Sequence, residues 1–258
     1  MRLAVTGASG RMGGEVLAAA ADRAESVVLA VSSDPEAVDP VTVDADTAVV
    51  HDADLADALA AHEVDVLVDF TAPAALADYA AACVDAGVAL VTGTTGLTDD
   101  GRAALADAAE SVPVLHAPNF SKGVAVLTQL VGDAAAALAD YDVELVEAHH
   151  DGKTDAPSGT ALSLLDAVDD ARGESPRVHG REGEAPRSGE EVGVHAVRAG
   201  DVTGVHEVWL AGGREELRLT HRAESRRVFA EGALDAAAWL AGRDAGEHDF
   251  AEVLEVGA

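Results

Sequence analysis

Short apolar segments alternate with helical patterns along residues 1–121, and this alternation limits the fold more than any other feature of the chain. The apolar segments predict strands at residues 2–6, 27–32, 48–50, 65–71, 88–92 and 112–116. Patterns typical of helices begin near Arg11, Ala53, Pro73 and Thr98. Because strands that alternate with helices form a parallel sheet covered on both faces, this part of the chain is expected to be Rossmann-like.

The rhythm changes after residue 121. A helix is expected at 123–139, a strand at 143–148, a helix at 158–171 and a long polar loop at 172–191. Strands are then expected at 192–198, 205–210 and 216–220, and a helix at 225–240 precedes an acidic tail. Consecutive strands without helices between them indicate a mixed or antiparallel sheet. The expected fold class is α/β, with a second, C-terminal α+β domain that contains a mixed sheet.

A glycine-rich segment joins the first expected strand to the first helix, with the spacing Gly-x-x-Gly-x-x-Gly from Gly7 to Gly13. Glycines there permit a tight turn and a close approach to a pyrophosphate, and the helix start offers free amides. Asp34 follows about 20 residues later, where a carboxylate accepts hydrogen bonds from the adenosine ribose. An ordinary turn and a surface aspartate are the plainer alternatives. The candidate dinucleotide contacts are Gly7, Ala8, Ser9, Gly10, Arg11, Met12 and Asp34.

Two further loops follow expected strands at their carboxyl ends. In an open parallel sheet the ligand crevice lies at those ends. Small, glycine and hydroxyl residues there are suited to pass beside a nicotinamide ribose and ring, although turn chemistry alone also explains them. The candidate contacts in these loops are Gly93, Thr94, Thr95, Ala117, Pro118, Asn119 and Phe120.

A third segment brings two imidazoles and an ammonium close to a helix start. His149, His150 and Lys153 precede the expected helix, whose first residues include Gly159 and Thr160. Histidine is suited to proton transfer near neutrality, and helix amides favour a carboxylate. Both histidines follow a strand in this interpretation, so their side chains should diverge. The segment therefore predicts a site for an anion that must be protonated.

A metal site is the rival interpretation of the same residues, with His149, His150 and Asp151 as ligands. Adjacent histidines rarely converge on one metal, so no metal is expected. Surface histidines beside a capped helix are the structural alternative. Cys83 is the only cysteine, which excludes an internal disulfide and a cysteine-rich metal site. Each remaining histidine is taken as structural or superficial, and no local signal distinguishes Arg181, Arg198 or Arg222 as an anion contact.

The formal charge of −30 excludes several kinds of partner. Nucleic-acid backbones and anionic membrane surfaces require basic patches, so neither is an expected partner. No apolar stretch is long enough to predict a signal peptide or a membrane span, and a cytoplasmic location is expected. Abundant Asp with scarce Lys suggests a surface adapted to high salt, where carboxylates stay hydrated and their repulsion is screened.

Taken together, these motifs resemble the 4-hydroxy-tetrahydrodipicolinate reductase (dihydrodipicolinate reductase) family, in an acidic form typical of halophiles. The resemblance covers nearly the whole chain in order, and segment 147–160 is its most specific part. The matching segments are 5–13, 69–71, 93–96, 117–121, 147–160, 198–206 and 220–226.

The resemblance implies a homotetramer of two-domain subunits. Residues 1–121 would form a dinucleotide-binding domain completed by residues 226–258, and residues 122–225 would bind substrate and build the oligomer. The implied reaction is reduction of 4-hydroxy-tetrahydrodipicolinate, a dicarboxylate, by hydride transfer from NADH or NADPH with loss of water. Another dinucleotide-dependent oxidoreductase, such as an amino-acid dehydrogenase on a related fold, is the alternative.

The resemblance also implies roles for individual residues. His149 would be the proton donor or acceptor and Lys153 a second donor, while His150, Gly159 and Thr160 would hold the substrate carboxylates. The cofactor contacts would be the glycine loop, Asp34 and the two later loops already described. Many members follow the acidic residue with an arginine that serves NADPH. Pro35 stands there in this chain, so NADH is the favoured cofactor.

The high net charge predicts a protein that is less stable at low salt. Self-repulsion among the carboxylates is screened at molar salt and becomes strong when salt is removed. The unfolding midpoint in urea, measured across a series of KCl concentrations, should therefore rise with salt. A midpoint that does not change over the series contradicts the prediction.

Overall fold

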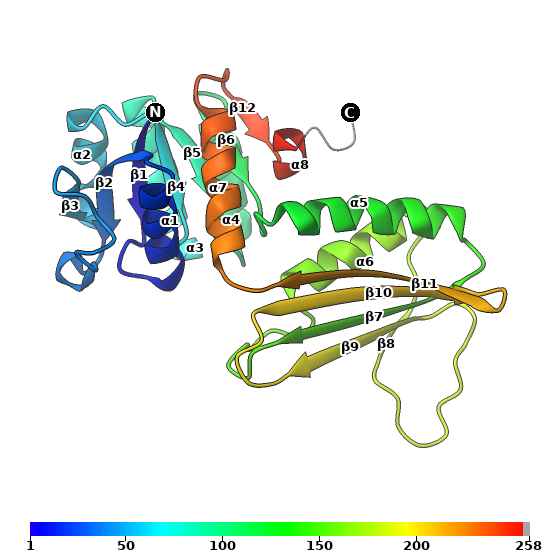
Figure 1. Ribbon diagram of the computed structural model, residues 1–258. Coiled ribbons are helices and arrows are strands. Elements are labelled where there is room, and N and C mark those ends of the chain that lie inside the picture. The colour runs from blue at the N-terminus through cyan, green and yellow to red at the C-terminus, as the bar shows by residue number, and fades with distance from the viewer. Residues whose placement is uncertain (255–258) are drawn as a thin grey trace. The chain divides into compact units, whose positions relative to one another are not determined.

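The computed structural model describes residues 1–254, which form two compact units (Figure 1). The first unit comprises Met1–Ser121 together with the described residues from Arg226 onward, and the second comprises Lys122–Ser225. The expected fold class is confirmed, since the first unit contains a parallel sheet and the second contains a mixed one.

The first unit is built on a seven-stranded sheet in the order β12-β6-β5-β4-β1-β2-β3, with every adjacent pair parallel. The chain runs outward from β1 to β3, then crosses to β4 on the other side of β1. This reversal places a ligand crevice at the carboxyl ends of β1 and β4. The strands are β1 (Arg2–Thr6), β2 (Ser26–Ser32), β3 (Ala48–His51), β4 (Val66–Asp69), β5 (Ala89–Thr92), β6 (Pro113–His116) and β12 (Gly246–His248).

Helices cover both faces of this sheet. In Figure 1, α1 (Arg11–Asp22) and α7 (Arg227–Leu240) lie side by side in front of it, and the two helices are in contact. The opposite face is covered by α2 (Leu55–Ala61), α3 (Pro73–Ala86) and α4 (Asp99–Ala109), and α8 (Phe250–Val253) is the last described helix. All residues of β4 and β5 are buried, which explains why these strands read as continuous apolar runs rather than alternating ones.

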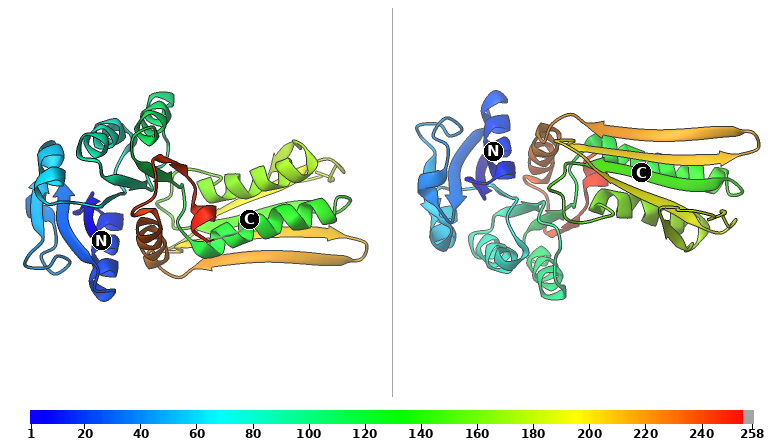
Figure 2. Two further views of the ribbon diagram at one scale, coloured as in Figure 1. Left: turned by 90° about the horizontal axis from the view of Figure 1, so that it is seen from above. Right: turned by 90° about the horizontal axis from the view of Figure 1, so that it is seen from below.

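The second unit is a five-stranded sheet in the order β11-β10-β7-β9-β8, antiparallel on the β10 side of β7 and parallel on the β9 side. Both helices, α5 (Lys122–Ala137) and α6 (Gly159–Arg172), cover one face of the sheet, as the two views of Figure 2 show. The strands are β7 (Asp142–His149), β8 (Arg177–His179), β9 (Val192–Arg198), β10 (Gly204–Gly212) and β11 (Glu215–Ala223).

Strand β7 carries both core residues and buried polar residues of the candidate site. Its buried positions alternate, so Val143, Leu145, Glu147 and His149 share the face beneath the helices. The first two belong to the apolar core with residues of α5 and α6. The last two are polar, so the same sheet face carries a hydrophobic core at one end and buried ionisable groups at the other.

The structure corrects three expectations of local structure. The expected loop at 172–191 contains β8, which pairs with β9 between Arg177 and Val192. The acidic tail contains β12, which extends the first sheet by pairing with β6, and also α8. The helix expected near Ala53 begins at Leu55, after a 3-10 turn. The two missed strands have three residues each, too few for a sequence pattern, and pairing with a longer strand holds them in place.

Adjacent glycines in α1 provide a matched test of the nucleotide loop. A methyl group on Gly13 would lie 2.1 Å from the carbonyl oxygen of Gly7, whereas one on Gly14 would meet no atom within 4 Å. Gly13→Ala should therefore destabilise the protein by about 1–3 kcal/mol through overpacking. Gly14→Ala should stabilise it by about 0.5–1 kcal/mol, because alanine favours a helix. Urea unfolding measures both, and equal effects would contradict the loop geometry.

Candidate functional site

The loop after β1 is shaped for close backbone approach. Gly7 has a positive φ of 66°, and its carbonyl accepts a hydrogen bond from the amide of Gly10 at 2.8 Å. The amide of Ala8 donates to Val31 in β2 at 3.0 Å, which ties the loop to the neighbouring strand. Together with the missing Cβ at Gly13, this turn leaves a cradle of backbone that a larger residue would fill.

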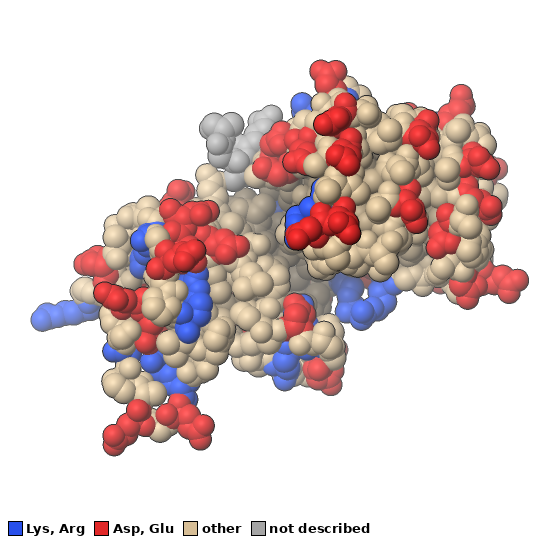
Figure 3. All heavy atoms as spheres, turned by 180° about the vertical axis from the view of Figure 1, so that it is seen from behind, with Lys and Arg blue, Asp and Glu red and all other residues tan. Residues whose placement is uncertain are grey.

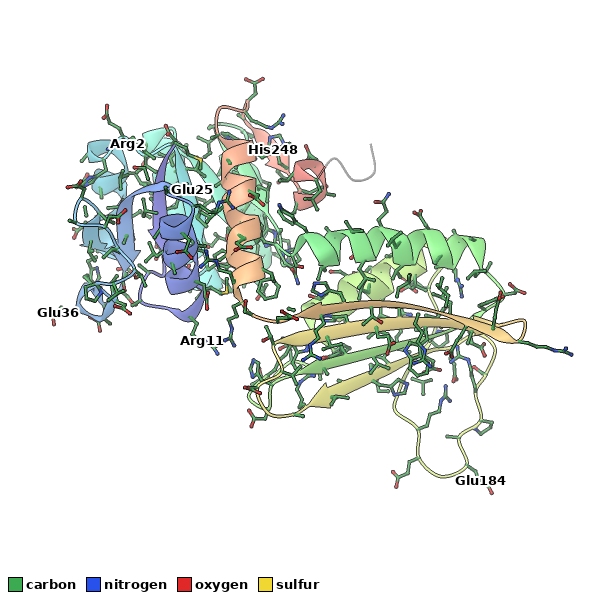
Figure 4. All side chains as sticks on the ribbon, viewed as in Figure 1. Arg2, Arg11, Glu25, Glu36, Glu184 and His248 are labelled. Carbon is green, nitrogen blue, oxygen red and sulfur yellow. The ribbon has the colours of Figure 1, made fainter. Side chains whose placement is uncertain are left out.

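The start of α1 suits an anionic group. Within residues 1–254 no side chain caps this helix, and its first turn holds no acidic residue. The positive end of the helix dipole is therefore available to a phosphate. Arg11 is exposed at this end, and Figure 4 shows its side chain extending outward from the helix; Met12 is half-buried. These features fit the pyrophosphate of a dinucleotide.

Asp34 lies beside this loop. It comes two residues after β2 and is exposed. The buried hydroxyl of Ser32 binds the hydroxyl of Ser9 at 2.7 Å and both the amide and the carbonyl of Asp34 at 3.0 Å. One serine thus joins the glycine loop to the Asp34 turn, so the structure brings the two predicted parts of the nucleotide site together.

A fully buried carboxylate organises the next part of the crevice. Asp69 ends β4, and its two oxygens accept four hydroxyl hydrogen bonds. Thr6 and Thr71 donate to Oδ1 at 2.7 and 2.6 Å, and Thr92 and Thr94 donate to Oδ2 at 2.7 Å each. Thr6 and Thr92 end β1 and β5, and Thr71 and Thr94 lie in the loops after β4 and β5. Asp69 therefore holds three central strand ends in one arrangement.

The two later loops pack against this centre. The amide of Thr71 donates to the Thr94 hydroxyl at 3.2 Å, and the amide of Ala117 donates to the carbonyl of Thr92 at 3.1 Å. A Cβ on Gly93 would lie 2.1 Å from the ring of Phe70, so only glycine fits there. The structure brings the predicted loops to neighbouring strand ends. Their buried residues are Thr94, Ala117 and Phe120; Gly93 and Asn119 are half-buried; Thr95 and Pro118 are exposed.

The predicted anion site in the second unit is centred on another buried carboxylate, Glu147. Its Oε2 lies 2.6 Å from Nδ1 of His149. The two terminal nitrogens of Arg198 each donate a hydrogen bond to one carboxylate oxygen, both at 2.8 Å. The amide of Ser158 donates to Oε1 at 3.2 Å. His149 is the last residue of β7 rather than a residue of the following loop, which corrects its expected position.

A second imidazole stands next to His149. The rings of His149 and His206 are 5.1 Å apart, edge to face, and Nε2 of His206 lies 3.0 Å from the hydroxyl of Ser158. That hydroxyl also accepts a hydrogen bond from the amide of Ala161 at 3.2 Å, which caps α6. The helix start and two neighbouring strands are therefore fixed around the same polar cluster.

Burial and charge act against each other in this cluster. Burial alone would raise the pKa of Glu147, but hydrogen bonds from Arg198 and His149 hold it below its usual value. Burial lowers the pKa of His149 and outweighs the opposite effect of Glu147. Burial, with a contribution from His149, lowers the pKa of His206 to about 4, so His206 is neutral at pH 7.

The other predicted residues lie outside the buried cluster. Lys153 pairs with Asp155 at 2.9 Å, and its backbone amide donates to the carbonyl of His150 at 3.2 Å. His150 is half-buried in the loop after β7. Gly159 is exposed and Thr160 half-buried, both in the first turn of α6. The two histidines thus differ in surroundings: His149 is held by protein groups, whereas His150 and Lys153 belong to the surface loop.

Sequence reasoning missed four residues that build these sites: Asp69, Glu147, Arg198 and His206. Strand periodicity would have found two of them. Glu147 is in phase with the core positions of β7, and His206 is in phase with Val208 and Leu210 of β10. A polar residue in phase with core positions is buried, and burial of such a group indicates a role.

No group of three or more metal-binding side chains occurs in the part of the chain that the structure describes. None of the helices described here is long and apolar enough to cross a membrane.

The fold and the glycine cradle define a class: a two-unit protein whose first unit is a Rossmann-type domain suited to bind a dinucleotide. Family comparison then narrows the class. Residues 1–120 match the family described as dihydrodipicolinate reductase, N-terminus, and residues 123–254 match its C-terminus. The chain belongs to the dihydrodipicolinate reductase family.

Relatives agree over the whole length of the chain. It is 53% identical over 254 residues to the 4-hydroxy-tetrahydrodipicolinate reductase of Haloarcula marismortui, covering 98% of this chain and 99% of the relative. It is 49% identical over 255 residues to the enzyme of the same name from Natronomonas pharaonis, covering 98% of this chain and all of the relative (100%).

Solved structures show the same fold. A dipicolinate-bound dihydrodipicolinate reductase from Paenisporosarcina sp. TG-14 superposes with a TM-score of 0.79 over 98% of both chains, at 24% identity. An amine dehydrogenase from Mycobacterium smegmatis superposes with a TM-score of 0.62 at 12% identity, covering 96% of this chain and 94% of its own. Because dehydrogenases of other kinds share the fold, the family match and not the fold decides between them.

Replacement of Asp69 should destabilise the first unit more than an ordinary surface change. Asp69→Ala leaves four hydroxyl groups without their acceptor in a buried place, and a loss of about 3–5 kcal/mol in unfolding free energy is expected. Asp85→Ala, an exposed aspartate of α3, is the control and should change stability by about 0.5 kcal/mol or less. Urea unfolding of both variants makes the comparison. A small loss for Asp69→Ala would contradict the role assigned to the hydroxyl network.

Proposed function

We propose that the protein is a 4-hydroxy-tetrahydrodipicolinate reductase. It reduces 4-hydroxy-tetrahydrodipicolinate to tetrahydrodipicolinate with NADH or NADPH and with loss of water, in the diaminopimelate route of lysine biosynthesis. The observation that carries this proposal is the full-length family match, which spans both the nucleotide unit and the unit that contains His149 and Lys153. The buried imidazole of His149, close to the start of α6, is suited to supply the proton that such a reduction needs.

The first unit binds and orients the dinucleotide in this proposal. The backbone cradle of Gly7–Gly13 and the start of α1 receive the pyrophosphate, and Asp34 accepts hydrogen bonds from the adenosine ribose. The loops Gly93–Thr95 and Ala117–Phe120 border the nicotinamide end, where Asp69 fixes the strand ends. When bound, the cofactor supplies the hydride. The chain contributes orientation, which accounts for a large share of such catalysis.

The second unit binds the dicarboxylate and supplies protons. His149 gives or takes a proton at Nε2, because its Nδ1 faces Glu147. Lys153 is the second proton donor. His150, Gly159 and Thr160 hold the carboxylates, the last two through the helix start. Local cations and amides therefore bind a dianion in a protein whose formal charge is −30.

Further properties belong to the same proposal. We infer a homotetramer, with residues 122–225 as the oligomerisation domain and residues 1–121 with 226–258 as the dinucleotide-binding domain. We also infer a cytoplasmic protein adapted to high salt, in keeping with acidic side chains spread over both units in Figure 3. Size measurement in solution at molar salt tests the tetramer.

The assay of this function uses freshly made hydroxytetrahydrodipicolinate and follows NADH oxidation. Removal of Lys153 by Lys153→Ala should lower the turnover by roughly 10²–10⁴-fold, because a proton donor and a positive charge are lost. Lys122→Ala removes the only other lysine, which is exposed, and should leave turnover near the starting value.

Oxaloacetate with ammonia is the competing substrate for the alternative activity of an amino-acid dehydrogenase. Turnover only with that pair would overturn the proposed function. Near-normal turnover of Lys153→Ala with hydroxytetrahydrodipicolinate would leave the reductase activity intact but refute the role of Lys153.

Cofactor preference is a separate prediction. An exposed carboxylate at Asp34 repels the 2′-phosphate of NADPH, and Pro35 supplies no compensating charge. The value of kcat/KM should therefore be higher with NADH than with NADPH. Asp34→Ser should reduce this ratio by raising the value for NADPH. An equal or inverse ratio in the unaltered protein would contradict the preference and would point to Arg11 as a phosphate contact.

A further inference from the structure

One buried carboxylate in the second unit, Glu147, enters the reaction outlined above only through its contact with Nδ1 of His149. Glu147 has no exposed surface. Burial of a carboxylate is unfavourable unless hydrogen bonds and opposite charge compensate it. The two oxygens of Glu147 receive four donors, from His149, Arg198 (two) and the amide of Ser158. A buried charge that needs so many compensating groups indicates a function for Glu147.

The contact with His149 fixes the orientation of its ring. Because Nδ1 lies 2.6 Å from Oε2 of Glu147, the acceptor-only carboxylate requires a proton on Nδ1. The reactive nitrogen is then Nε2. A Cβ on Gly204 would lie 3.3 Å from Nε2, tighter than ordinary contact, so the glycine at the start of β10 leaves space beside this nitrogen. One side of the imidazole is anchored and the other is kept open.

The charges around His149 come from every element packed near it. Glu147 on β7 favours the charged ring, whereas Arg198 on β9 and Lys153 in the following loop oppose it. His206 on β10 faces the ring edge to face and is neutral at pH 7. Arg198 binds both oxygens of Glu147. Its positive charge therefore weakens the effect of the carboxylate on the pKa of His149.

We propose that Glu147 is a positioning residue for His149, and that Arg198 is the counter-charge that tunes its effect. Glu147 holds the Nδ1 proton, so Nε2 alone exchanges a proton with substrate. In the transfer the N–H bond at Nε2 breaks, its proton passes to the substrate, and the ring is left neutral with Nδ1 still protonated. No proton moves to Glu147. This inference rests on the proposed function only in that His149 is the proton donor.

Opposite changes at the two partners test the proposal. Activity that needs protonated His149 falls as pH rises through its pKa, so this limb of the kcat/KM profile reports the ring in the free enzyme. Glu147→Gln removes the negative charge, and the limb should move to lower pH by about one unit. Arg198→Gln removes the positive charge, and the limb should move to higher pH. Above the limb, activity of Glu147→Gln should fall roughly tenfold, while KM for NADH stays unchanged.

A matched control is available on the same strand. Glu144 also accepts a hydrogen bond from a histidine, His195, at 2.7 Å, but it lies on the other face of the sheet. Glu144→Gln should leave the limb in place. If the variants only lost stability, the maximum of kcat/KM would fall in each pH profile. The limbs of Glu147→Gln and Arg198→Gln would then not move in opposite directions.

Titration of the His149 ring by NMR measures the same pKa without any turnover. A limb and a ring pKa that stay unchanged in Glu147→Gln would overturn the positioning role. Should Glu147→Gln fail to fold, Arg198→Gln decides the question by itself, since a shift to lower pH or no shift would overturn it. An unaltered protein that does not oxidise NADH with hydroxytetrahydrodipicolinate would refute the proposed function, while the NMR titration would still test the hold of Glu147 on His149.

Discussion

Burial of a carboxylate forces donors from several elements into one place, and each unit depends on one such group. Asp69 has no exposed surface and gathers hydroxyls from the ends of β1 and β5 and from the loops after β4 and β5. Glu147 gathers an imidazole, a guanidinium and a helix amide from β7, β9 and the start of α6. Because an unmet buried charge is so unfavourable, these contacts fix the loops that follow the strands.

The same principle reconciles the charge of the protein with its ligands. Long-range repulsion from a formal charge of −30 opposes an anionic substrate, but salt screens it over about 10 Å or less. At contact distance, helix starts and local cations act without such screening. The start of α1 is left uncapped by side chains among the described residues, and α6 begins six residues after Lys153 in the chain. Specific binding therefore depends on a few oriented groups and not on the overall charge.

Long strands and helices were predictable because each carries its own pattern. Val192–Arg198 was expected with its observed bounds, and the helix expected at 158–171 is observed as Gly159–Arg172, with Ser158 as its cap. Strands β8 and β12 were missed because they have three residues each and exist through pairing with β9 and β6. His206 was taken as structural, yet it lies 5.1 Å from His149, a contact between β7 and β10 that local sequence does not reveal.

The sequence by itself determined the two sheets, the glycine cradle and the segment that contains His149 and Lys153, because these features depend on local periodicity and on residue type. It did not distinguish His149 from His150. Only the tertiary structure shows that the two histidines have different surroundings. His149 lies at the end of β7 against Glu147, whereas His150 lies in the loop that follows. Contacts between residues 51 positions apart, such as Arg198 with Glu147, arise when strands pair, and no local pattern encodes them.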